Sequence, residues 1–143
     1  MVIYHAIKGV DEAGNPDQTS GELVRLIGEN CHTVVADNEL AERYSRHLKK
    51  LLSIPSLLYK TTEFLSEVIF NSSKFVVEAS PAPELPPGVK VPPEDKYVVR
   101  AALISHPIVV TAEKRVLRDV NAQSVLGLRA VTPAEALEFA KDT

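Results

Sequence analysis

The sequence alternates between short apolar runs and longer segments with helical periodicity, and this alternation limits the possible folds more than any other feature. The runs are too short for helices and several are rich in β-branched residues, which predicts strands. They cover residues 2–6, 32–36, 74–78, 107–111 and 128–131. Strands that alternate with helices are typical of a mainly parallel sheet covered on both faces. The sequence therefore predicts an α/β fold with such a sheet.

The segments between the apolar runs carry helix start and stop signals. Asp37 can cap the helix that follows the run 32–36. Thr132, Pro133 and Glu135 form a capping box with proline at the first helical position. Helices are predicted over residues 22–29, 38–52, 56–70, 93–104, 113–120 and from 133 onward. The segment 80–93 holds six prolines and is predicted to be a loop.

Length and composition exclude several classes of protein. A chain of 143 residues with a net charge of −3 predicts one domain, 1–143, without a basic nucleic-acid coat. The one cysteine, Cys31, excludes an internal disulfide framework and is interpreted as a structural thiol, and the scattered histidines form no zinc motif. No apolar run has membrane-span length, and the start lacks signal-peptide features, so we expect a cytoplasmic protein without a membrane partner.

Three acidic residues are expected at the carboxyl edge of the sheet, where sites form in such folds. Glu42 lies in the helix after the run 32–36, Asp95 lies in the first turn of the helix before the run 107–111, and Glu113 follows that run. A cluster of carboxylates suits Mg²⁺ or Mn²⁺, which can activate water and stabilise charge on a phosphodiester.

Each of these acids also has a structural alternative. Glu42 can pair with Arg46 on the surface at the i,i+4 spacing. Asp95 and Glu113 can be ordinary first-turn acids, which the helix dipole favours. Asp95 shares a helix face with apolar residues that turn toward the sheet, so a carboxylate there needs a partner or a metal.

Several stretches of the chain resemble the PIN domain. They are residues 34–44 (VVADNELAERY), 93–103 (PEDKYVVRAAL), 107–117 (PIVVTAEKRVL) and 130–137 (AVTPAEAL). The resemblance covers nearly the whole chain and is most specific in the C-terminal third. It implies a three-layer α/β/α fold and RNA cleavage with Mg²⁺ or Mn²⁺ held by three or four acids. Many PIN domains are the toxins of toxin–antitoxin pairs and many form homodimers, which implies RNA, an antitoxin or other protein, and a second copy as partners.

The resemblance assigns roles to the three acids and also exposes departures from the family pattern. Glu42 matches the middle acid, Asp95 the third, and Glu113 the fourth, which is usually Asp. The first acid is an Asp that ends the first strand, with an Asn two residues later; here His5 stands in the first apolar run. His5 can ligate Mn²⁺, or it can be a hydrogen-bonded core histidine. Arg115 stands where the family has a further acid, which weakens the binding of a divalent ion.

Two main functions remain open from the sequence. The first is a metal-dependent ribonuclease with Glu42, Asp95 and Glu113 as ligands, His5 as a further candidate ligand, and Arg43, Arg46 and Arg115 beside the RNA. The second is a degenerate PIN-like module that binds RNA or a protein without cleaving. A third, weaker hypothesis is a small α/β domain of receiver or flavodoxin type, for which the paired acids or phosphate loop are missing. The basic residues can equally form a solvated face.

Overall fold

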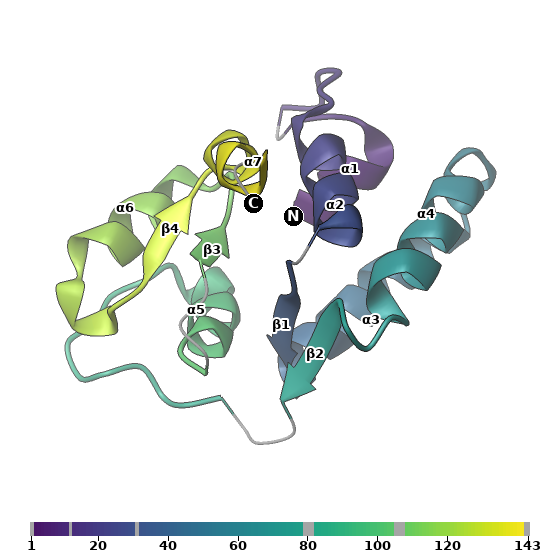
Figure 1. Cartoon of the computed structure of the whole chain (residues 1–143). Coiled ribbons are helices and arrows are strands. Elements are labelled where there is room, and N and C mark those ends of the chain that lie inside the picture. The colour runs from purple at the N-terminus through teal and green to yellow at the C-terminus, as the bar shows by residue number, and fades with distance from the viewer. Residues whose placement is uncertain (1, 12, 31, 79–81, 105–107, 142–143) are drawn as a thin grey trace.

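The computed structural model describes residues 2–11, 13–30, 32–78, 82–104 and 108–141 as a mixed α/β protein (Figure 1). The helices are α1 (Val2–Lys8), α2 (Thr19–Glu29), α3 (Asn38–Leu52), α4 (Leu58–Phe64), α5 (Lys96–Ala102), α6 (Lys114–Ala122) and α7 (Pro133–Lys141). The strands are β1 (Val34–Asp37), β2 (Phe75–Glu78), β3 (Ile108–Val110) and β4 (Arg129–Val131). The helix predicted over 56–70 is α4 continued by a π-helical turn, Leu65–Ile69.

The first apolar run is a helix, so the strand predicted over residues 2–6 is wrong. The backbone N–H groups of Gly9 and Val10 donate to the carbonyl of His5 at 2.8 and 3.1 Å, and Gly9 has a left-handed φ of 69°. A glycine in this conformation is the usual way to end a helix. A run of five apolar residues does not distinguish a strand from a buried helix, and here packing of α1 against α2 decides in favour of the helix.

The strands form two parallel pairs. In one pair Val34 lies opposite Phe75 and Asp37 opposite Glu78, and in the other Val109 lies opposite Ala130. Among the described residues β1 and β3 are not paired with each other. An apolar cavity of about 200 Å³ lies between them, lined by residues from both strands and from α2, α3 and α5. The parallel pairing predicted from the sequence is present, but the single sheet is divided.

The two strand pairs run in opposite senses. In Figure 1, β2 runs toward the lower part of the view, whereas β4 runs up to the start of α7 at the top. Helix α5 spans the distance between the pairs and contacts both β1 and β3. The carboxyl ends of β1 and β3 therefore point in opposite directions, which matters for the acids that follow them.

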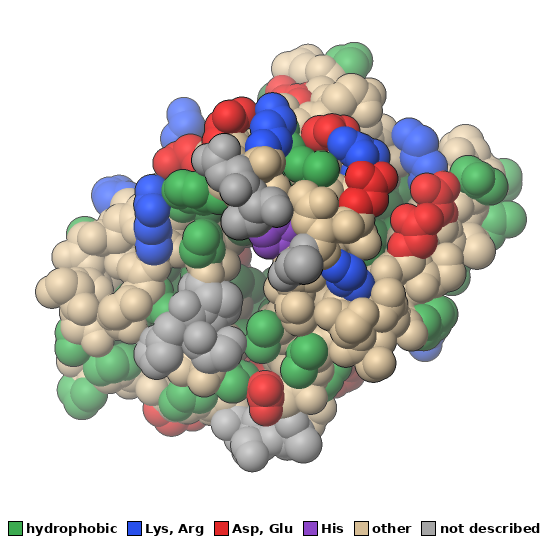
Figure 2. Space-filling view, in the orientation of Figure 1, with side chains coloured by type: hydrophobic (Ala, Val, Ile, Leu, Met, Phe, Trp, Pro, Cys, Tyr) green, Lys and Arg blue, Asp and Glu red, His purple; other side chains and the backbone are tan. Residues whose placement is uncertain are grey.

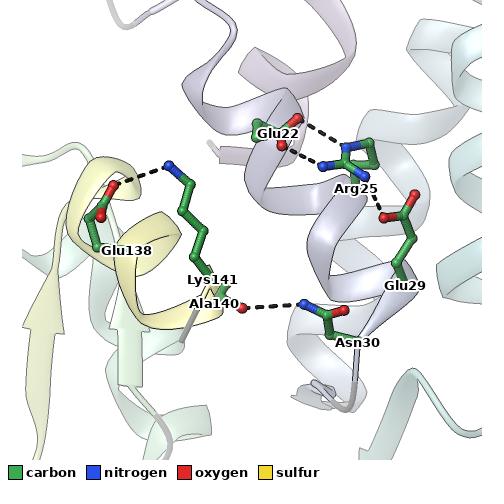
Figure 3. A network of polar contacts seen from close by, with 7 residues as sticks. All are labelled: Glu22, Arg25, Glu29, Asn30, Glu138, Ala140 and Lys141. Carbon is green, nitrogen blue, oxygen red and sulfur yellow. Dashed lines mark hydrogen bonds and ion pairs between the residues drawn. The ribbon is translucent and has the colours of Figure 1, made fainter. Parts of the chain in front are cut away.

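Separate hydrophobic clusters stabilise the two halves. One joins α5, α6, β3 and β4 through Val99, Val109, Val116 and Val120, and another joins α3 and α4 through Leu51 and Phe64. Helices α2 and α7 pack side by side, with Leu23 and Val131 in a third cluster. At their C-terminal ends the Asn30 amide donates to the Ala140 carbonyl at 3.3 Å (Figure 3).

Both predicted caps are present. The Asp37 carboxylate accepts the backbone N–H of Leu40 at 2.9 Å. In the capping box Thr132 Oγ1 accepts the Glu135 N–H at 3.2 Å, and the Glu135 carboxylate accepts the Thr132 N–H at 3.1 Å. Cys31 lies outside the described residues, as does residue 107 of the predicted strand 107–111. No helix among the described residues is both long and apolar enough to span a membrane.

Candidate functional site

Asp95 and Glu113 come together where α5 begins and β3 ends. Asp95 immediately precedes α5 and is partly buried, and Glu113 immediately precedes α6. Burial raises the pKa of the Asp95 carboxyl above its ordinary value, and the negative charges of Glu113 and Glu94 raise it further. The two acids that were predicted to share an edge are therefore close enough to repel each other.

The loop between β3 and α6 positions Glu113. Thr111 is buried at the end of β3, and its hydroxyl oxygen accepts the Glu113 backbone N–H at 3.1 Å. The side chain of Glu113 makes no capping hydrogen bond to α6 and is exposed. A carboxylate held this way at the backbone but exposed at its oxygens is available to a ligand from solvent.

Arg115 brings a positive charge to the same end of the molecule. Its guanidinium lies 3.5 Å from the carboxylate of Glu94, and both side chains are mostly exposed. An exposed pair of this kind contributes little to stability. Arg115 also lowers the pKa of Asp95, against the larger effects of burial and the two glutamates. Arg115, whose positive charge was predicted to weaken the binding of a metal ion, thus forms an ion pair with Glu94.

Glu42 lies apart from this pair. It is on α3, with its carboxylate 4.0 Å from Arg46 at the i,i+4 spacing. Its side chain is 73% exposed and that of Arg46 is 63% exposed. The structure therefore shows the surface pairing that was the alternative for Glu42. Glu42 is not among the charges that act on Asp95, and its carboxylate pairs with Arg46 instead of joining Asp95 and Glu113.

Arg43 is directed into the molecule. Its guanidinium carbon lies 3.9 Å from the ring centroid of Tyr97 on α5, and one nitrogen lies 3.4 Å from Glu39. Its Nε is buried with no hydrogen-bond partner among the described residues. Burial, with a smaller effect from Tyr97, raises the pKa of the neighbouring Tyr44 to about 12. Arg43 thus joins α3 to α5 at a largely apolar contact, next to the turn that carries Asp95.

His5 reaches the end of the molecule that carries Glu113, although α1 is a helix. It lines a cavity of about 240 Å³ together with Ala112, Lys114 and Thr132. Lys114 is the residue after Glu113, so His5 lies near the start of α6. It does not occupy the end of a strand, which was the position predicted for it.

Asp37 is the residue that the sequence reasoning treated only as a helix cap. Because residues 2–8 are helical, the first strand of the chain is β1, and Asp37 is its last residue and is buried. The run VVAD followed by Asn38 was the available signal. Ala36, the residue before it, belongs to the hydrophobic cluster that includes Tyr97 and Ala101 of α5, so Asp37 ends a strand that packs against the helix that Asp95 precedes.

The structure thus brings together two of the predicted acids. Within the part of the chain that the structure describes, no group of three or more His, Cys, Asp or Glu side chains is placed to hold a metal ion. Comparison with protein-family models, with curated proteins and with solved structures gives no match. The functional argument therefore depends on the chemistry of the chain itself.

Proposed function

We propose that this protein is a metal-dependent ribonuclease of the PIN type, with the three-layer fold that the resemblance implies. The observation that carries the proposal is the raised pKa of Asp95, which comes mainly from its partial burial and then from the negative charges of Glu113 and Glu94 nearby. Two ionised carboxylates that lie near each other repel, and a divalent cation bound between them relieves this repulsion. The pair also lies after a strand of a parallel pair, the usual position for a site in such folds.

The donor set fits Mg²⁺ or Mn²⁺. Mg²⁺ is commonly bound by one or two carboxylates, with water and substrate phosphate oxygens in the other positions. Bound there, the ion would supply an activated water and stabilise charge on the scissile phosphodiester. Asp95 and Glu113 would hold and orient the ion, and Arg115 would contact the RNA backbone.

The remaining assignments rest on the resemblance. Asp37 ends the first strand, where the family has its first acid, and is a further candidate ligand, although its carboxylate caps α3 in this structure. Glu42 and His5 remain candidates for the middle acid and for a further Mn²⁺ ligand, and Arg43 and Arg46 for contacts to RNA. A toxin role with an antitoxin partner, a homodimer and a cytoplasmic location are part of the same proposal.

A second candidate function is a PIN-like module that binds RNA or a protein without cleaving. The Glu94–Arg115 ion pair favours it, because a positive charge lies beside the acids. So does the position of Glu42, which is paired with Arg46 on α3.

RNA cleavage with added Mn²⁺ tests the proposal and separates the two functions. Asp95→Asn and Glu113→Gln should each lower the rate by at least the 10- to 100-fold typical of lost supporting groups at metal sites. Glu138→Gln is the matched control, because Glu138 pairs with Lys141 on α7, and it should leave the rate unchanged. Glu42→Gln tests whether the middle acid takes part.

Mn²⁺ binding measured by calorimetry provides the second readout. Binding that Asp95→Asn abolishes and Glu138→Gln preserves supports the nuclease. No cleavage at any metal concentration, together with Mn²⁺ binding unchanged by Asp95→Asn, would overturn it in favour of the binding module.

A further inference from the structure

The outer edge of β2 is open. Val34 of β1 donates its N–H to the carbonyl of Lys74 at 2.8 Å. Because backbone groups alternate in direction along a parallel strand, Phe75 and Val77 direct theirs away from β1. The Phe75 N–H donates to the Asn71 carbonyl at 3.0 Å, which leaves the Phe75 carbonyl and the Val77 N–H along the edge. No strand among the described residues pairs with this edge.

The corresponding edge of β4 is covered. Thr111 donates to the Val131 carbonyl at 3.0 Å, so Ala130 directs its backbone groups outward. The side-chain amide of Asn121 accepts the Ala130 N–H and donates to the Ala130 carbonyl, both at 2.9 Å. Unpaired strand edges favour association with another strand, and proteins commonly block them. Here β4 is blocked and β2 is not.

The side chains around β2 are apolar. Val76 is 37% exposed, Val77 is 42% exposed and the preceding Phe70 is 77% exposed. A groove of about 240 Å³ lies beside them, lined by Phe70, Phe75 and residues of α3 such as Leu48 and Leu52. Figure 2 shows hydrophobic side chains at the surface where β2 lies in Figure 1.

The sequence of this edge is complementary to itself. Read antiparallel, Lys74-Phe75-Val76-Val77-Glu78 places Lys74 of one copy opposite Glu78 of the other at both ends. Within each copy the Lys74 ammonium also donates to the carbonyls of Asn30 and His32. Val76 then lies opposite Val76, on the two-fold axis. Phe75 lies opposite Val77, so the outward Val77 N–H of each copy meets the outward Phe75 carbonyl of the other. Opposite charges and paired β-branched residues in this arrangement stabilise a sheet.

We propose that β2 pairs antiparallel with β2 of a second copy of this chain, in the register centred on Val76. The result is a continuous four-stranded sheet of order β1-β2-β2-β1 across a two-fold axis. The inference specifies the surface of the homodimer named under the proposed function, but it uses no residue of the proposed nuclease site, so dimerisation and cleavage are tested separately.

Cysteine cross-linking tests the register. In a Cys31→Ser background, Val76→Cys places two thiols opposite each other in a non-hydrogen-bonded pair, whose Cα separation of about 4.5 Å is within disulfide range. Val77→Cys places them diagonally, roughly 7 to 8 Å apart, which is too far. We expect a disulfide-linked dimer from Val76→Cys under mild oxidation. Val125→Cys is the matched control, since Val125 is an exposed valine outside this edge.

Cross-linking of Val77→Cys above Val76→Cys would overturn the register, and equal yields from Val76→Cys and Val125→Cys would overturn the pairing. A charge substitution gives an independent measurement by analytical ultracentrifugation. Val76→Lys puts two like charges opposite each other and should weaken the dimer by about tenfold or more, whereas Val125→Lys should not change it. Circular dichroism of both variants checks that they fold. A wild-type chain that stays monomeric at all concentrations would overturn the proposal.

Discussion

The two strand pairs have the same parallel geometry but differ in how their outer edges are finished. On the β3–β4 side, one amide side chain near the end of α6 and a second just after the helix each pair with backbone groups. Asn121 pairs with both backbone groups of Ala130, and Gln123 pairs with both backbone groups of Lys90 at 2.7 Å. On the β1–β2 side the edge is bordered by exposed Val76 and Phe70.

The difference shows that a short strand pair can be closed from within the chain. A side-chain amide carries both N–H donors and an acceptor oxygen, so it can bond the N–H and the carbonyl that one residue presents at a strand edge. One well-placed side chain can therefore bond the outward backbone groups of a strand as short as β4 and block its edge. Where no such side chain exists, as at β2, the backbone groups are left for water or for another chain.

The largest effect is expected from removing the amide that covers β4. Asn121→Ala leaves the Ala130 N–H and carbonyl without their partners, which should lower the free energy of unfolding by about 2 kcal/mol. Urea denaturation followed by circular dichroism measures it. The variant should also open a second edge, so we expect assemblies larger than a dimer in ultracentrifugation.

Two further variants sharpen this result. Asn121→Asp keeps the acceptor for the Ala130 N–H but loses the donor to its carbonyl, and should fall between wild type and Asn121→Ala. Asn15→Ala, an exposed loop position, should change the free energy of unfolding by less than about 0.5 kcal/mol. A loss from Asn121→Ala no larger than that from Asn15→Ala would show that the covered edge contributes nothing to stability.

Local signals predicted most of the secondary structure. The cap Asp37 and the capping box at Thr132 each act within a few residues, and the structure bears them out. The five-residue run at the N-terminus was the exception. Its residue pattern alone does not indicate that it packs against α2, and this packing makes it a helix. The long-range arrangement was harder still. The division of the sheet into two pairs depends on how α5 packs between β1 and β3.

The candidate site was predictable in part for the same reason. Asp95 and Glu113 flank one helix–strand unit, so their proximity follows from the local order of elements. Placing Glu42 with them needed the direction of β1 relative to β3, which alternation does not specify. Asp37 was overlooked as a site residue because its role as a cap already explained it.

A smaller effect is expected at the caps, one on each side of the comparison. Asp37→Ala removes the acceptor of the Leu40 N–H and should lower the free energy of unfolding by about 1 kcal/mol, as should Thr132→Ala at α7. Asp37→Asn should cost much less, because asparagine caps as well as aspartate. Thermal denaturation measures all three.

The asparagine variant also separates the two roles of Asp37. If its charge serves the proposed site, Asp37→Asn loses RNA cleavage while keeping its stability. Cleavage that Asp37→Asn retains would limit Asp37 to capping α3.

The smallest stability effect is expected at Asp95, and its sign distinguishes a functional acid from a structural one. The pKa of Asp95 is raised in the folded protein, so the ionised carboxylate opposes folding at neutral pH. This unfavourable contribution disappears as the pH falls through the raised folded-state pKa toward the ordinary value of 3.8. Asp95→Asn should therefore raise the free energy of unfolding at pH 7 slightly, with no gain at pH 3.

Added Mn²⁺ should make the wild-type protein more stable than the Asp95→Asn variant at pH 7. A cation bound between Asp95 and Glu113 stabilises the wild-type fold in proportion to its affinity and leaves Asp95→Asn unchanged. Thermal denaturation with and without Mn²⁺, at pH 7, measures both effects, with Glu138→Gln as the matched acid outside the site. An Asp95→Asn variant that is less stable than wild type at pH 7 would mean that the β3–β4 side uses Asp95 to hold its fold rather than to receive a ligand.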